Sequence, residues 1–135
     1  MISVVPYLTF EGAAALAIEL YTSAFPDGAV LHDERFEKES LRGQVRMARI
    51  RIGGQEIMLS DSGTTHDYSF TPASALYVEC DDEEQLHALH EHLGHGGKDL
   101  MKPDNYGFSK LFVWFNDRLG VSWQLNVANE DDDDE

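Results

Sequence analysis

Cysteine is almost absent from this sequence, since Cys80 is the only one among 135 residues. A single cysteine excludes an internal disulfide and a cysteine-based zinc site, and it fits a reducing, cytoplasmic setting. Residues 1–6 lack the basic stretch and the long apolar region of a signal peptide. No apolar run approaches the roughly 20 residues needed to cross a bilayer. We therefore expect a cytoplasmic protein with no membrane partner.

Basic residues are also scarce. The chain has 10 Lys and Arg against 25 Asp and Glu, which gives a formal net charge of -15. Nucleic-acid binding requires clustered Lys and Arg, so this balance argues against nucleic acid as a partner. The last six residues, 130–135, are all acidic. Such a run repels itself and buries nothing, so we predict a disordered acidic tail over residues 129–135.

The remaining composition is that of an ordinary folded chain, with 42% hydrophobic and 10% aromatic residues. A chain of this length has room for one domain with a real core and little room for a second. We predict a single domain over residues 1–128.

The first half of the chain reads as one strand, one helix and three strands. Leu16, Ala17, Leu20, Tyr21 and Ala24 recur at helical spacing and are predicted to form one apolar helix face. Glycine and proline mark the turns that bound these segments. The predicted elements are a strand over 2–10, a helix over 13–25, and strands over 29–36, 45–52 and 55–60.

The same order then repeats. Asp81 and Asp82 can cap a helix that runs to about Leu93, and Gly94 ends it. The predicted strands are 75–80, 97–101, 110–116 and 121–127, with a loop over 103–108. The repetition predicts an α+β fold of paired βαβββ modules, about 1–62 and 73–128, joined by a polar linker over 61–72.

Several segments, spread in order over nearly the whole chain, resemble the PhnB-like branch of the vicinal-oxygen-chelate (glyoxalase/bleomycin-resistance) superfamily. This branch is also labelled 3-demethylubiquinone 3-methyltransferase-like. The most specific segments are Tyr106-Gly107-Phe108-Ser109-Lys110 and residues 117–125; the others are 6–12, 25–27, 54–56 with 60–62, 70–72 and 96–98. The resemblance implies that the two modules form an incomplete barrel around a concave cavity and that the protein is a homodimer.

The resemblance also implies where a divalent metal would be held, at the first and last strands of each module. These positions fall near Pro6, at Met58, near Ala75 and at Gln124. Only Gln124 offers a usable oxygen, whereas a metal held by protein normally has three or more N or O ligands. We therefore expect no metal cofactor. A metal-dependent lyase, isomerase or dioxygenase, with Gln124 and ligands elsewhere, is the alternative.

The methyltransferase label has no support in the residues. An S-adenosylmethionine site on a doubly wound sheet needs a glycine-rich turn after a parallel strand, and the sequence contains no such turn.

Two other groups of reactive side chains have simpler interpretations. His87, His90, His92 and His95 lie close in sequence but do not converge on one face of a helix, which predicts a solvated or part-buried helix surface. Cys80 stands at a strand end with no base nearby in sequence, and we interpret it as a small core residue.

The aromatic and amide residues of the second module are the best candidates for a binding site. Because strand residues alternate between faces, Gln124 and Trp123 point in opposite directions, and Trp123 is predicted to pack against the helix. The predicted ligand pocket is lined by Met58, Ser60, Tyr77, Tyr106, Phe108, Trp114 and Gln124. The resemblance to the PhnB-like branch, together with the missing metal ligands, implies a metal-independent small-molecule-binding protein. A structural or interaction module, in which these side chains merely fill the barrel, is a further alternative.

Overall fold

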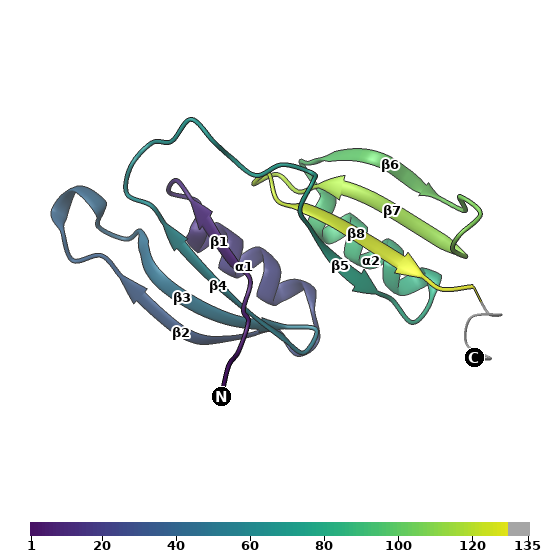
Figure 1. Cartoon of the computed structure of the whole chain (residues 1–135), viewed down its shortest axis with the longest axis horizontal. Helices are drawn as coiled ribbons and strands as arrows, with labels where there is room; N and C mark the ends of the chain where they lie inside the picture. The colour runs from purple at the N-terminus through teal and green to yellow at the C-terminus, as the bar shows by residue number, and fades with distance from the viewer. Residues whose placement is uncertain (130–135) are drawn as a thin grey trace. The chain divides into compact units, whose positions relative to one another are not determined.

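The computed structural model describes residues 1–129 and divides the chain into two compact units, Met1–Asp67 (unit 1) and Tyr68–Glu135 (unit 2) (Figure 1). The boundary falls inside the predicted polar linker. Residues 130–135 of the predicted acidic tail lie outside the described residues.

Both units have the predicted order of strand, helix and three strands. Unit 1 contains β1 (Tyr7–Phe10), α1 (Ala14–Ala24), β2 (Ala29–Arg35), a short 3-10 helix η1 (Glu39–Leu41), β3 (Val45–Ile52) and β4 (Gln55–Asp61). Unit 2 contains β5 (Ala75–Glu79), α2 (Glu83–Gly94), β6 (Lys98–Asp104), β7 (Leu111–Asn116) and β8 (Ser122–Val127). The α+β class and the paired βαβββ arrangement are confirmed.

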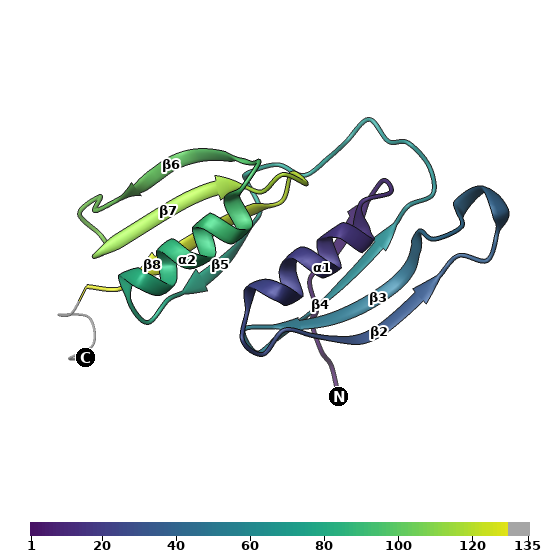
Figure 2. The same ribbon diagram turned by 180° about the vertical axis from the view of Figure 1, so that it is seen from behind.

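Each unit is a four-stranded mixed sheet, ordered β1-β4-β3-β2 in unit 1 and β5-β8-β7-β6 in unit 2. The first strand of each unit pairs in parallel with the last, and the other pairs are antiparallel. One helix packs on one face of each sheet, α1 on β3 and β4, and α2 on β7 and β8 (Figure 2). Neither sheet closes into a barrel.

The core of each unit lies between its helix and its sheet. In unit 1 the helix-facing strand residues Ala48, Ile50 and Ile57 are fully or almost fully buried. In unit 2 Trp123 has no exposed surface, and its indole Nε1 donates to Asp117 Oδ2 at 2.9 Å. Trp123 lies opposite Phe115, whose ring contacts His90 of α2, so Trp123 packs on the helix side of the sheet as predicted.

Three predicted details are wrong. Leu16 is 55% exposed, because the buried face of α1 is set by Ala14, Ala17 and Tyr21, and 100° per residue places Leu16 opposite them. β1 begins at Tyr7 rather than at position 2. β6 continues through Pro103, which the sequence places in a loop; proline is tolerated there because β6 is an edge strand.

The two helices begin in different ways. Asp82 caps α2 by accepting a hydrogen bond from the Gln85 backbone N at 2.8 Å, as the sequence predicts. The residue at the start of α1 is Ala13, which has no side chain that can cap. The carboxylate of Asp61, at the end of β4, accepts from the backbone N of Gly12 and Ala14 instead.

Candidate functional site

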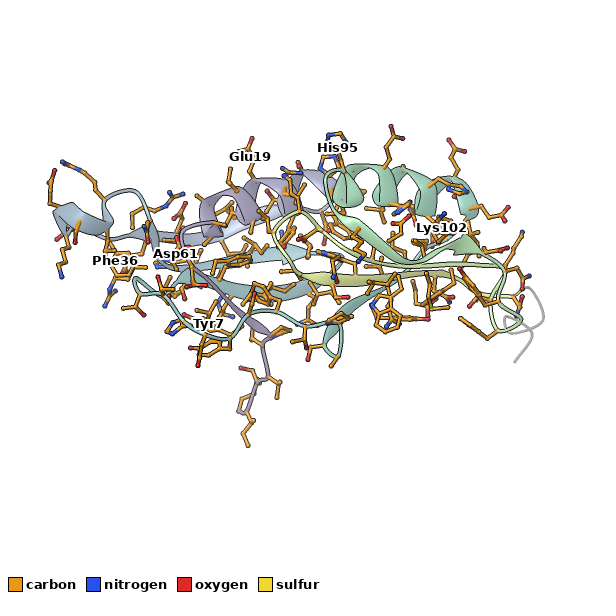
Figure 3. The ribbon with its side chains drawn as sticks, turned by 90° about the horizontal axis from the view of Figure 1, so that it is seen from above. Tyr7, Glu19, Phe36, Asp61, His95 and Lys102 are labelled. Atoms are coloured by element: carbon orange, nitrogen blue, oxygen red, sulfur yellow. The ribbon has the colours of Figure 1, made fainter. Side chains whose placement is uncertain are left out.

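The face of each sheet that lies opposite its helix is the best candidate for a binding surface. Figure 3 shows Tyr7 on the side of its sheet away from α1, whereas Glu19 points outward from that helix. We call these surfaces the helix-free face of unit 1 and of unit 2.

The centre of the helix-free face of unit 2 is a row of three residues on neighbouring strands. Tyr77 of β5 lies opposite Gln124 of β8, which lies opposite Trp114 of β7. Tyr77 is 54% exposed, while Gln124 and Trp114 are half-buried. The Trp114 indole Nε1 donates to Ser122 Oγ at 2.8 Å, which fixes the orientation of the ring. The Gln124 amide makes no hydrogen bond within residues 1–129.

Two polar side chains, Glu79 and Asn126, lie two residues beyond Tyr77 and Gln124 on the same strands. Glu79 accepts a hydrogen bond from Asn126 Nδ2 at 3.1 Å, and Asn126 also bonds the hydroxyl of Ser109. The pKa of Tyr77 is raised, first by partial burial and then by the negative charge of Glu79 and a hydrogen bond to it. The Tyr77 phenol is therefore neutral and can act as a hydrogen-bond donor at physiological pH.

Tyr106 and Phe108 lie in the loop after β6, and the rings of both contact the ring of Phe112. Their rings stack with centroids 6.1 Å apart, and Phe108 meets the edge of Phe112 at 5.1 Å. Phe112 is two residues before Trp114 on β7, so both point to the same face of the sheet. The loop thus adds an aromatic edge to the helix-free face of unit 2, and 55% of Phe108 is exposed.

The helix-free face of unit 1 has a corresponding row with different chemistry. Tyr7 lies opposite Met58, which lies opposite Arg49 of β3. The Tyr7 hydroxyl donates to Ser60 Oγ at 2.9 Å. Arg49 Nη1 donates to Glu56 Oε1 at 2.9 Å, and Nη2 lies 3.5 Å from the Met58 sulfur.

The predicted pocket residues therefore fall into two sets. Tyr77, Trp114 and Gln124 come together in one row, with Tyr106 and Phe108 gathered on Phe112. Met58 and Ser60 belong to unit 1. Their role as ligand contacts stays a prediction.

Sequence reasoning missed Tyr7 and Arg49. A signal for Arg49 was present, because Arg49 and Arg51 alternate with the buried Ile50 and Ile52 along β3. An arginine on the polar side of such a strand faces away from the core. Tyr7 had no comparable signal, since its partners Met58 and Ser60 are about 50 positions away.

The donors on these faces do not fit a hard divalent ion. Met58 and Gln124 hold the central positions of their rows, and neither is a carboxylate or an imidazole. Glu56 is engaged by Arg49 and Glu79 by Asn126. Among residues 1–129 no group of three or more His, Cys, Asp or Glu could hold a metal ion.

The histidines of α2 do not form a cluster of ligands. His90 Nε2 lies 2.7 Å from Asp99 Oδ1, and its ring packs against Phe115 at 5.1 Å. The other three, His87, His92 and His95, are exposed. His90 is thus the part-buried member of an otherwise exposed helix surface.

A small polar cavity of about 160 Å3 lies elsewhere in unit 1. It is lined by Glu11, Gln44, Gly63, Thr64 and Thr65. None of the predicted pocket residues line it, and its one carboxylate already accepts from the backbone N of His66.

Cys80 is buried, as predicted, and burial raises the pKa of its thiol to about 11. At pH 8 only about one thiol in a thousand is then ionised, and the thiolate is the reactive form.

We expect iodoacetamide to label native Cys80 at least 10-fold more slowly than the urea-unfolded chain, with the native rate rising toward pH 11. Mass spectrometry of timed samples measures both rates. Equal native and unfolded rates would contradict this environment.

None of the helices within residues 1–129 has the length and apolar character needed to span a membrane.

Solved structures place the fold in a known class. A glyoxylase/bleomycin resistance protein/dioxygenase domain from Frankia sp. EAN1pec superposes with a TM-score of 0.69 at 15% identity, covering 96% of this chain and 94% of that one. The protein PA1353 from Pseudomonas aeruginosa gives a TM-score of 0.82 at 23% identity, covering 95% and 98%. At such identities the likeness shows the fold, and it is the glyoxalase/bleomycin-resistance fold.

The family follows from the sequence match. The family model described as 3-demethylubiquinone-9 3-methyltransferase matches residues 2–126, and the chain belongs to that family. A putative 3-demethylubiquinone-9 3-methyltransferase, PhnB protein, from Bacillus cereus is 39% identical, covers 94% of this chain and 100% of its own, and gives a TM-score of 0.90. The resemblance to the PhnB-like branch is confirmed. A search of the curated proteins found no match.

The family's description names an activity that the fold does not explain. Both described sheets are mixed and have one parallel pair each. The doubly wound parallel sheet of nucleotide-type cofactor sites is a different arrangement.

Proposed function

We propose that this PhnB-like protein binds a small organic molecule without a protein-held metal, and that the ligand lies on the helix-free face of unit 2. The observation that carries the proposal is the amide of Gln124, which has no hydrogen-bond partner in the described chain and lies between Tyr77 and Trp114. An amide offers both donors and an acceptor, so it can orient a polar ligand.

The surroundings of Gln124 support a flat, partly polar ligand. Small-molecule sites combine apolar and aromatic walls with a few polar groups. Trp114 and Tyr77 supply aromatic surface on the two neighbouring strands, and Tyr106 and Phe108 extend it beside Phe112. Ring stacking adds about 0.5–1.5 kcal/mol to the burial of a planar group. Met58 and Ser60 lie on the helix-free face of unit 1, and a role for them in ligand binding is a separate proposal for that unit.

Tryptophan fluorescence can test this site. Both tryptophans are in unit 2: Trp114 is half-buried on the helix-free face, whereas Trp123 is fully buried on the helix side. A panel of aromatic amides, starting with benzamide and nicotinamide, is titrated into the protein. We expect a saturable change in emission that is lost in Trp114→Phe. We expect Gln124→Leu to weaken binding about 10-fold, because one good hydrogen bond contributes about 1.5 kcal/mol.

Gln55→Leu is the matched control, since Gln55 is an exposed glutamine at the β3–β4 turn of unit 1. It should bind the panel as the unaltered protein does. A Gln124→Leu protein with unchanged affinity would overturn the site, and a panel with no saturable response would overturn the proposal. Stoichiometric divalent metal in the purified protein, lost with Gln124→Leu, would favour the metal-dependent enzyme instead.

A homodimeric state and a cytoplasmic location are also proposed, and they rest on the resemblance to the PhnB-like family and on composition. Light scattering tests the first, because a dimer of this 15.2 kDa chain has a molar mass of about 30 kDa.

A further inference from the structure

We infer that the helix-free face of unit 1 binds a carboxylate group, held between Arg49 and Tyr7 above the Met58 side chain. This inference rests on the proposed small-molecule-binding function and adds the chemical class of the ligand. It uses residues of unit 1 alone.

Only one terminal nitrogen of the Arg49 guanidinium donates to a strong acceptor. A guanidinium has five N–H donors. Glu56 accepts from Nη1 at 2.9 Å, whereas Nη2 donates to the Met58 sulfur at 3.5 Å. A thioether is a weak acceptor, so Nη2 keeps most of its capacity for a stronger one. The Arg49 side chain is 34% exposed, so its charge is partly shielded and still accessible.

The second donor is the hydroxyl of Tyr7. It lies on the other side of Met58 in the same row, two strand spacings or roughly 10 Å from Arg49 at the backbone. Its current partner is the neutral hydroxyl of Ser60 at 2.9 Å, and half of the Tyr7 side chain is exposed. Rotation of Tyr7 can exchange that neutral acceptor for a charged one, which forms a hydrogen bond about twice as strong.

A carboxylate matches this pair of donors. In the structure these donors point toward opposite ends of β4, Tyr7 to Ser60 and Arg49 to Glu56. Tyr7 therefore has to turn from Ser60 toward Met58 before the two carboxylate oxygens can accept one bond from each side, with the uncharged substituent resting on the apolar Met58 side chain. The chain carries a net charge of -15, which opposes anions at long range. At physiological ionic strength, however, charges more than about 8 Å away are largely screened. The local charge is then that of the Arg49–Glu56 ion pair, and a ligand carboxylate has to compete with Glu56 for the guanidinium.

The competition with Glu56 gives the sharpest test. Benzoate and its uncharged isostere benzamide are titrated into 15N-labelled protein, and the side-chain N–H signal of Arg49 is followed by NMR. We expect benzoate to shift this signal with at least 10-fold higher affinity than benzamide. Arg49→Gln should lower benzoate affinity at least 10-fold. Glu56→Gln should raise it about 3- to 10-fold, because Nη1 is then released.

Arg46→Gln is the matched control. It removes the same charge from the same strand, and Arg46 is also paired with a glutamate, Glu34. It should change benzoate affinity less than 2-fold. If the Arg49–Glu56 pair is purely structural, Arg49→Gln and Glu56→Gln should both lower the stability of the protein, and neither should bind benzoate more tightly. Equal affinity for benzamide, or no gain with Glu56→Gln, would overturn the inference.

The result is separable from the test of Gln124. If the aromatic amides change Trp114 emission while benzoate leaves the Arg49 signal unshifted, the carboxylate site alone is overturned. Benzoate binding at Arg49 with no response at Trp114 would support the carboxylate site and contradict the proposed site in unit 2.

Discussion

Replacement of Asp61 by alanine is expected to lower the free energy of unfolding by about 3–5 kcal/mol. The Asp61 carboxylate is 3% exposed and accepts three backbone hydrogen bonds, from Gly12 at 2.7 Å, Ala14 at 3.0 Å and Val45 at 2.9 Å. Without it, these donors lose their partner, at about 1–3 kcal/mol for each one that is buried. For a domain with a total stability of about 5–15 kcal/mol, this loss is large.

Urea unfolding followed by circular dichroism measures this effect, and amide hydrogen exchange locates it. Exchange should quicken first at Gly12, Ala14 and Val45, because Asp61 joins the start of α1 to β3. Asp61→Asn keeps one acceptor oxygen and should lose less. Asp67→Ala, at an exposed aspartate, should stay within about 0.5 kcal/mol. A loss below 1 kcal/mol for Asp61→Ala would show that Asp61 does not cap α1.

Replacement of Trp123 by alanine is expected to lower the free energy of unfolding by about 5 kcal/mol. Deleting a fully buried aromatic side chain costs about 3–5 kcal/mol through lost burial and the cavity left behind. Trp123 has no exposed surface and also donates to the buried Asp117 Oδ2. The loss of this hydrogen bond to a buried carboxylate adds to the cost.

The matched comparison is Trp114, the other tryptophan of the chain. Trp114→Phe should cost less than about 1 kcal/mol, since its side chain is only half-buried on the helix-free face. Trp123→Phe keeps part of the volume and should lose about half as much stability as Trp123→Ala. Urea unfolding followed by circular dichroism avoids dependence on the altered fluorophore. Equal losses at the two tryptophans would contradict their assignment to opposite faces.

Local patterns in the sequence were sufficient for the order and bounds of several elements. β3 spans Val45–Ile52, as predicted, because alternation within a strand is a local property. Gly53 and Gly54 both have positive φ, at 55° and 80°, which is the conformation that a two-residue hairpin turn requires. The helix cap at Asp82 could also be predicted from local sequence, since the backbone N that it accepts from belongs to Gln85, three residues away.

The candidate site was only partly predictable. Alternation within β8 separated Gln124 from Trp123, and the structure confirms that Trp123 is buried on the helix side. The neighbours of Gln124 depend on pairing: Tyr77 is 47 positions away, and its register is set when β5 pairs in parallel with β8. Sequence periodicity gives the face of each side chain, but it does not give the register between strands.

The sequence by itself determined the α+β class, the repeated order of elements and the buried tryptophan. These follow from composition and from spacings of two to four residues, which fix local backbone geometry. Only the tertiary structure placed Arg49 and Tyr7 on either side of Met58 and brought Asp61 to the start of α1. Those contacts join residues far apart in the chain, and they form only when whole strands pair and a helix packs on them.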